Sequence, residues 1–342
     1  MTIKQDERIT LLHGAGGQMM DELLAQILKR FKRTSVGGIG LEELDDGAVI
    51  PLAGKNLVFT TDSHVVQPIF FPGGDIGRLA VAGTVNDLAV MGAQPIALSC
   101  GLVIPEGFSI AELELVLESM DRALEEAGAA LITGDTKVLG HGELEGLIIN
   151  TAGIGLAERV ISDAGLRVGD RLLVTGTIGD HGMALMAHRE GLGFETTLES
   201  DVAPINHLIG EALRAGGAGI TAMKDPTRGG LASALNEMAR KAGVGVTVYD
   251  EEIPMRDEVR GLGELLGINP LEVANEGKAV IGVAPERAEA VLEALKRHPQ
   301  GRNAALIGEA TGDYPGKVIL VTEVGWRRFL ENPLSDPVPR IF

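Results

Sequence analysis

Cysteine is almost absent from this sequence, which has a single one, Cys100, within the apolar run ALSCGLVI. One thiol excludes intramolecular disulfides and any zinc site built from several cysteines. This usage fits a reducing compartment, and we expect the protein to be cytoplasmic. In its apolar surroundings Cys100 is predicted to be a buried small residue rather than a nucleophile.

Basic side chains are scarce compared with acidic ones. The chain has 30 Lys and Arg against 48 Asp and Glu, a formal net charge of −18. Recognition of a phosphate backbone needs clustered Lys and Arg, so this balance argues against nucleic acid as a partner. An excess of carboxylates instead suits a protein that holds divalent cations.

Long apolar runs and the common nucleotide-binding motifs are also lacking. The N-terminus is charged from Lys4 onward and has no signal-peptide core. The uncharged stretch 88–105 is interrupted by Gly92, Pro95 and Gly101, which favours a helix end, a turn and a buried strand over a membrane span, and we expect no membrane partner. Neither GxGxxG nor GxxxxGK[ST] occurs where a Rossmann or P-loop site would need it, and no HExxH pair of histidines indicates zinc.

The pattern of strands and helices predicts two α/β domains, because 342 residues exceed what one hydrophobic core usually serves. The predicted parts are an N-terminal segment at 1–36, a first domain at 37–162, a second domain at 168–330 and a proline-rich tail at 331–342. Proline at this density favours an extended, mobile tail. In the second domain, 226–243 is predicted to be a helix with Pro226 in its first turn.

The stretch 72–93 is predicted to be a single helix, with Asp75 as its N-terminal cap and Gly92 at its end. Helical spacing places Asp87 on a stripe of small residues that cannot shield it, with Gly83 and Thr84. A buried, unpaired carboxylate is costly, which indicates a cation partner. A partly solvated surface Asp87 is the alternative.

Acidic residues next to glycines or at expected strand ends form a series: Asp45, Asp46, Asp62, Asp87, Asp135 and Asp225. Carboxylates that converge at strand ends can hold Mg²⁺, and Mg²⁺ can carry the phosphates of a nucleotide. The alternative is that each is a turn former.

Three further residues have the chemistry to assist such a site. Lys137 follows Asp135 by two residues, on the same side of an extended segment, and could contact phosphate or simply pair with Asp135. Glu276, in ANEGK, could be a general base, although loop glutamates usually are not. Arg228 precedes two glycines at a predicted helix start, where it could bind an anion unless Asp225 merely caps that helix.

Several longer motifs occur in a fixed order along the chain: HGAGG, DDGA, FFPGGDIGRLAVAGTVNDLAVMGA, TGDTKV, NTAGIG, GTIGDHGMAL, KDPTRGGLASALNE and NEGK. From about residue 11 to the tail, the chain resembles the HypE family of hydrogenase maturation factors. This family is related to aminoimidazole ribonucleotide synthetase, selenophosphate synthetase and thiamine-monophosphate kinase. The resemblance implies a homodimer in which strands of the two N-terminal domains form a β-barrel, with a C-terminal α/β domain beside it.

The resemblance also implies an activity. In the family, the carbamoyltransferase HypF places a carbamoyl group on the C-terminal cysteine, ATP phosphorylates the carboxamide oxygen, and loss of phosphate leaves a thiocyanate. The cyano group then passes to iron on a HypC–HypD scaffold complex, for the [NiFe]-hydrogenase centre. By resemblance, Asp46, Asp62, Asp87, Asp135 and Lys137 bind ATP, with Asp46, Asp87 and Asp135 as Mg²⁺ ligands, and Lys137 and Glu276 are catalytic.

The sequence departs from the family at Phe342, which follows Pro-Arg-Ile where the family has its acceptor cysteine. A phenyl group cannot carry the carbamoyl group, so this chain is expected to bind ATP without accepting it. An introduced substitution and natural loss of catalysis both explain this, and the intact site motifs favour the first. The alternative functions are a non-catalytic ATP-binding partner protein and another small-molecule synthetase or kinase of the superfamily.

Overall fold

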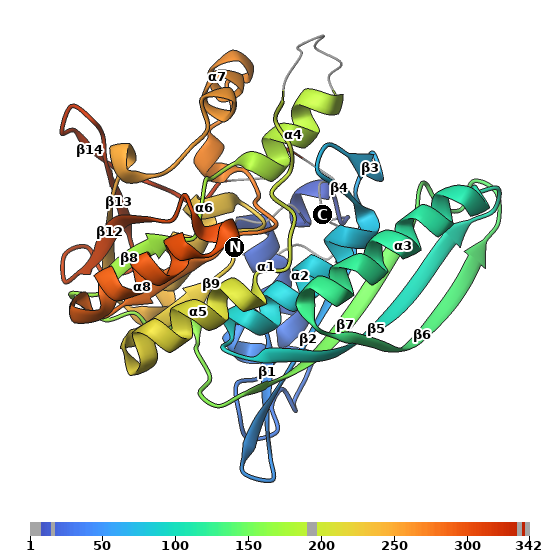
Figure 1. Cartoon of the computed structure of the whole chain (residues 1–342), viewed down its shortest axis with the longest axis horizontal. Coiled ribbons are helices and arrows are strands. Elements are labelled where there is room, and N and C mark those ends of the chain that lie inside the picture. Colours follow the sequence, from blue (N-terminus) through green and yellow to red (C-terminus); the bar gives the residue numbers. More distant parts are fainter. Residues whose placement is uncertain (1–7, 15–17, 190–196, 334–336, 339–342) are drawn as a thin grey trace.

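Two α/β domains lie side by side in the computed structural model, which describes residues 8–14, 18–189, 197–333 and 337–338 (Figure 1). The first domain is built on a five-stranded sheet with the strand order β1-β2-β7-β5-β6. The second is built on a seven-stranded sheet with the order β14-β13-β10-β12-β8-β11-β9. The chain leaves the first sheet at Ala157 and enters the second at Arg171.

In the N-terminal domain, α3 connects the two parallel strands β5 and β6, and the other neighbours in the large sheet are antiparallel. The short strands β3 and β4 form a separate hairpin. The strands are β1 (Ala48–Leu52), β2 (Lys55–His64), β3 (Phe70–Phe71), β4 (Gly74–Asp75), β5 (Gln94–Pro105), β6 (Ala130–Leu139) and β7 (Ile148–Ala157). The helices are α1 (Gln18–Leu28), α2 (Ile76–Val90) and α3 (Ile110–Ala127).

In the C-terminal domain, only β10 and β13 pair in parallel. The strands are β8 (Arg171–Val174), β9 (Ile220–Lys224), β10 (Gly245–Tyr249), β11 (Val280–Val283), β12 (Ala305–Thr311), β13 (Val318–Val321) and β14 (Arg327–Phe329). The helices are α4 (Asp180–Arg189), α5 (Asn206–Gly216), α6 (Gly230–Ala242), α7 (Asp257–Leu266) and α8 (Pro285–Arg297). Short 3-10 turns lie at Leu11–His13, Leu41–Glu43, Asp163–Gly165, Gly217–Gly219, Asp250–Glu252, Pro270–Glu272 and Pro299–Gly301.

Helix α2 confirms the helix predicted for 72–93. The Asp75 carboxylate accepts hydrogen bonds from the backbone N–H groups of Gly77 and Arg78, at 2.7 and 3.0 Å. After the helix, Gly92 has a φ of +79°, which allows the chain to turn into β5. Every residue of α2 except Arg78 and Asp87 is buried, so the helix lies inside the molecule.

The two domains are joined through α2. Its residues contribute to three of the four apolar clusters among the described residues, two of which extend into the C-terminal domain. Buried Asn86 adds three polar links: its Nδ2 donates to the carbonyls of Ala203 and Glu276, both at 3.1 Å, and its Oδ1 accepts from the N–H of Ile205 at 2.9 Å. A side chain with three partners in the other domain fixes the position of one domain against the other.

Strand β6 forms an exposed edge of the first sheet (Figure 1). Every residue from Ala130 to Val138 is exposed, including the apolar Leu131, Ile132 and Val138, which are 46%, 65% and 66% exposed. An open edge with exposed apolar side chains is a surface suited to pairing with another chain.

Helix α6 begins later than the sequence predicts. It starts at Gly230, so the prediction that Pro226 lies in its first turn is wrong. Gly229, which precedes the helix, and Gly230, its first residue, have φ angles of +72° and +61°, so the backbone is left-handed where the helix begins. The residues from Pro226 to Gly229 therefore form a turn before the helix.

Two described residues of the tail pack against the body of the protein. Pro333 is buried beside the turn before α6, and Val338 is fully buried in the apolar cluster that includes α2 and α3. Burial of these apolar side chains offsets the entropy lost on ordering them. Residues 334–336 and 339–342 lie outside the described part, so the extended, mobile tail stays a prediction.

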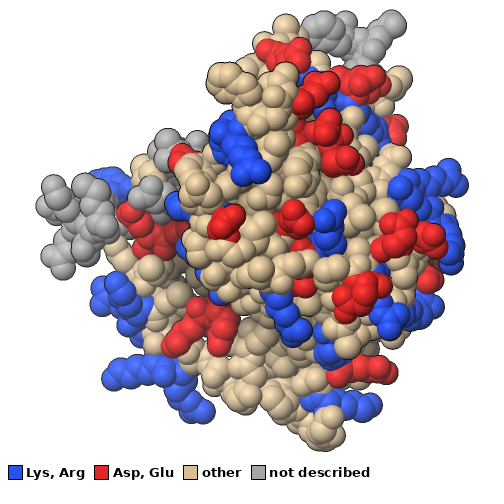
Figure 2. Space-filling model, turned by 90° about the vertical axis from the view of Figure 1, so that its left-hand side faces the viewer, with Lys and Arg blue, Asp and Glu red and all other residues tan. Residues whose placement is uncertain are grey.

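The surface agrees with the charge pattern of the sequence. Over the face shown in Figure 2, acidic and basic side chains are interspersed and do not form one continuous basic surface. None of the described helices combines the length and apolar composition needed to cross a bilayer.

The close packing of α2 on α3 predicts a large effect of Gly77→Ala. A Cβ at Gly77 would lie 2.3 Å from the Val116 carbonyl oxygen, so the helices must separate, at a cost of roughly 1–3 kcal/mol in the free energy of unfolding. Gly261→Ala, in α7, is the control, because a Cβ there meets nothing within 4 Å and should raise stability by up to about 1 kcal/mol. Denaturant titration measures both; equal effects of the two substitutions would contradict this packing.

Candidate active site

A cavity of about 310 Å³ lies where the two domains meet, and acidic side chains dominate its wall. The N-terminal domain contributes part of α1, loop residues before β1, the C-terminal end of β2, and Gly83 and Asp87 of α2. The C-terminal domain contributes the end of β9, the turn before α6, part of α6 and the loop before β11. The charged residues are Asp21, Asp45, Asp46, Asp62, Asp87, Lys224, Asp225, Arg228, Glu237, Arg240, Lys241 and Glu276.

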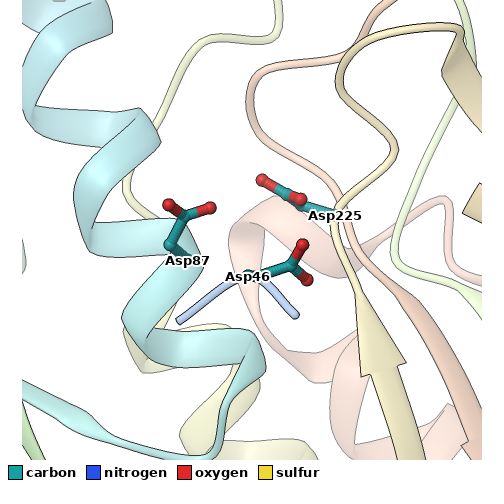
Figure 3. A group of neighbouring side chains, drawn as sticks. All are labelled: Asp46, Asp87 and Asp225. Carbon is teal, nitrogen blue, oxygen red and sulfur yellow. The ribbon is translucent and has the colours of Figure 1, made fainter. Parts of the chain in front are cut away.

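Three of these carboxylates face one another across the domain boundary (Figure 3). Asp87 is on α2, Asp46 is in the loop before β1, and Asp225 directly follows β9. One carboxylate oxygen from each lies within 4.8 Å of the other two. Carboxylate oxygens at this separation are the donors that hard divalent cations such as Mg²⁺ prefer.

The triad of Asp46, Asp87 and Asp225 is electrostatically strained without a cation. Burial raises the pKa of Asp46 and of Asp87 well above the usual range. Lys224 opposes the shift at Asp46, and neighbouring carboxylates raise the pKa of both residues further. Burial raises the pKa of Asp225 to about 6, with Lys224 opposing the shift. In addition, Asp46 Oδ2 is buried and has no hydrogen-bond partner among the described residues. A bound cation would satisfy that oxygen and relieve the repulsion, so the residues fit a metal site.

Glu276 lies in the same cavity and is 3% exposed. Its carbonyl accepts from Asn86 and its N–H donates to Asp201 Oδ1 at 3.0 Å, so its backbone is held from both sides. Burial, and then the charge of Asp225, raises the pKa of Glu276 well above its usual range. Its Oε1 has no hydrogen-bond partner in the described part of the chain. A fixed carboxyl with a raised pKa is suited to proton transfer near neutral pH.

The structure brings together most, but not all, of the site residues expected from the sequence. Asp46, Asp62, Asp87 and Glu276 line one cavity. The expectation that the acidic residues lie at strand ends is wrong for Asp62, which is within β2, and for Asp135, which is within β6. A strand can contain these aspartates because the Asp62 side chain is only half-buried and the Asp135 side chain is exposed.

Asp135 and Lys137 do not line this cavity within one subunit. Both are exposed on β6, at the outer edge of the first sheet, and Asp225 completes the carboxylate triad in the place expected for Asp135. Phe342 lies outside the described residues. Cys100 is 5% exposed, as expected, and burial raises the pKa of its thiol.

The sequence points to Asp225, as one of the acidic series expected to hold a cation, but it does not point to Lys224 or Asn86. Asp225 lies directly after β9 and before two glycines. Lys224 reaches Asp46 from a strand end, and Asn86 is next to Asp87 in the long central motif. Adjacency to acidic motif residues is the signal that could have identified both.

Comparison with known proteins identifies the family of the chain. Residues 44–157 match the N-terminal domain of AIR synthase related proteins, and residues 167–321 match the C-terminal domain. A putative hydrogenase expression/formation protein of Methanocaldococcus jannaschii is 54% identical over 98% of this chain and 99% of its own length. Carbamoyl dehydratase HypE of Bradyrhizobium diazoefficiens is 46% identical over 97% of this chain and 96% of its own. The chain belongs to the HypE family.

Solved structures of the HypE family have the same fold. A HypE–HypF complex matches with a TM-score of 0.85 and 40% identity, covering 93% of this chain and all of the matched one. HypE in complex with ATP matches with a TM-score of 0.81 and 39% identity, covering 98% of this chain and all of the other. The resemblance to the HypE family seen in the sequence motifs is confirmed.

The raised pKa of Asp225 predicts a pH-dependent stability. Because the folded pKa of about 6 exceeds the unfolded value, protonated Asp225 stabilises the fold below pH ~4, and this contribution is lost as pH rises through 6, amounting to roughly 3 kcal/mol. In EDTA, Asp225→Asn should therefore gain stability relative to the parent between pH 5 and 8, measured by denaturant titration. Asp121→Asn, on the exposed side of α3, should show no such trend. A constant difference at every pH would contradict the assignment.

Proposed function

We propose that this protein is an ATP-dependent hydrogenase maturation factor of the carbamoyl dehydratase type. The observation that carries the proposal is the triad of Asp46, Asp87 and Asp225 beside Glu276 in the interdomain cavity. The names of its relatives, carbamoyl dehydratase HypE among them, support the same activity.

The cavity is proposed to bind Mg²⁺ together with ATP. A wall this rich in carboxylates repels a triphosphate unless cations lie between them. Mg²⁺ supplies that positive charge and polarises the phosphates when bound. Asp46, Asp87 and Asp225 would hold the metal, Asp62 lies beside them, and Arg228 offers a guanidinium from the same wall. A solved HypE structure that contains ATP supports nucleotide binding.

Asp135 and Lys137 are proposed to act across a homodimer interface. Their strand, β6, is an exposed edge with apolar side chains that a second subunit would cover. Barrel formation between two N-terminal sheets, implied by the family resemblance, would place this strand against the partner. Lys137 would then contact the nucleotide of the neighbouring subunit, and Asp135 would add to its metal site.

Glu276 is proposed to remove a proton during dehydration of the carboxamide. Once the carboxamide oxygen is phosphorylated, loss of phosphate requires that the nitrogen give up its protons. Glu276 has a backbone fixed by Asn86 and Asp201, and its Oε1 has no hydrogen-bond partner among the residues that the structure describes. Its raised pKa increases its strength as a base.

The acceptor and the partners complete the proposal. The carbamoyl group would come from HypF, and a solved HypE–HypF complex supports that partner. The cyano group would leave to a HypC–HypD scaffold. Position 342 carries phenylalanine, so this chain is proposed to bind Mg-ATP without accepting carbamoyl.

Replacing Phe342 by cysteine is expected to restore the acceptor. With HypF, carbamoyl phosphate and ATP, Phe342→Cys should gain a cyano adduct by intact-protein mass spectrometry, whereas the parent chain and Phe342→Ala should gain none. Glu276→Gln in the Phe342→Cys background should leave the carbamoyl adduct in place of the cyano adduct, because the proton acceptor is missing.

Cys100 is the internal control, since it is the single cysteine of the sequence. Cys100→Ala combined with Phe342→Cys should form the same adduct as Phe342→Cys alone. An adduct on the parent chain, or none on a Phe342→Cys protein that binds both ATP and HypF, would contradict the proposed function.

A further inference from the structure

Lys224 places a positive charge directly behind the carboxylate triad. Its ammonium group lies at the end of β9, with its Nζ 2.5 Å from Asp46 Oδ1, 3.3 Å from Glu237 and 3.7 Å from Asp163. The lysine side chain is 11% exposed. Three carboxylates therefore surround this buried ammonium group.

The two oxygens of Asp46 have different environments. Oδ1 accepts a hydrogen bond from Lys224, whereas Oδ2 is buried and lacks a hydrogen-bond partner in the described part of the chain. Lys224 is the one hydrogen-bonding partner that the described residues give this carboxylate. The Asp46 side chain is 9% exposed, so water offers little replacement.

From this arrangement we infer that Lys224 is the positioning residue of the metal site: it holds Asp46 by Oδ1 so that Oδ2 is presented to the divalent cation. The inference rests on the proposed function, because it concerns the Mg²⁺ of that site. Partners that orient metal ligands typically change metal affinity by 10–100-fold when removed.

Nearby charges keep Lys224 from acting mainly as a competitor of the metal. Asp163 and Glu237 belong to the domain connector and to α6, and neither is a member of the triad. Their negative charges offset the ammonium group, while Asp46 keeps the shortest contact with it. Removing Lys224 should therefore weaken metal binding, because the affinity lost when Asp46 is no longer oriented exceeds the affinity gained by removing a positive charge near the cation.

Lys278 provides a matched control. Its Nζ lies 3.1 Å from Asp201 Oδ2, and its side chain is 11% exposed, the same value as for Lys224. Among the described residues, it neither lines the cavity nor forms an ion pair with Asp46 or another member of the triad. Its removal tests the loss of a buried ammonium group without touching a proposed metal ligand.

The experiment is a titration of the full-length protein with Mn²⁺ alone, followed by electron paramagnetic resonance of the free ion. Lys224→Met should weaken binding about tenfold, while Lys224→Arg, which keeps the charge, should stay within about threefold of the parent. Lys278→Met should bind Mn²⁺ like the parent. Near-ultraviolet circular dichroism establishes that each variant is folded.

A double-mutant cycle with Asp46→Asn identifies the route of the effect. If Lys224 acts through Asp46, Lys224→Met should cause no further loss in the Asp46→Asn protein. Unchanged or tighter binding by Lys224→Met, an equal loss in Lys278→Met, or additive losses in the cycle would each overturn the inference while leaving the proposed function intact. Failure of the parent protein to bind Mn²⁺ would overturn both.

Discussion

Mutual repulsion among carboxylates at the domain boundary is the constraint on which the rest of the structure depends. Asp46, Asp87, Asp225 and Glu276 share one cavity, and burial disfavours the charge of each. Folding alone gains nothing from such a cluster, since apolar residues of similar size would be cheaper to bury. The cluster makes physical sense when a cation and a phosphorylated ligand complete it. The cluster therefore lowers the stability of the protein without ligand and raises its affinity for a cation and a phosphorylated ligand.

A rigid framework is needed to hold like charges together, and α2 supplies it. The helix is buried on nearly all sides and carries Asp87 at one of its few open positions. Its neighbour Asn86 links the loop of Glu276 to the same helix, so the proposed metal ligand Asp87 and the proposed base Glu276 are both tied to α2. Lys224 fixes Asp46 from the other domain. Contacts between the two domains thus position Asp46 and Glu276.

Signals from neighbouring residues are sufficient to predict some helices and site residues. Contacts between residues far apart in the sequence could not be predicted in this way. Helix α2 could be predicted because Asp75 and Gly92 mark its ends, but α6 could not be placed correctly because Pro226 imitates a helix start. Partners of Lys224 and Asn86 lie 178 and 190 residues away, a separation that no periodicity reveals. Asp135 illustrates a different limit: spacing and motif indicate a ligand, but only the fold shows that its strand is at an open edge.

The most direct test of the central claim is anomalous diffraction from Mn²⁺ in crystals grown with a non-hydrolysable ATP analogue. The account predicts a metal peak bound by Asp46, Asp87 and Asp225, with the nucleotide phosphates beside it and the partner subunit's Lys137 within reach of them. A metal and nucleotide bound elsewhere, with this triad left empty, would contradict it.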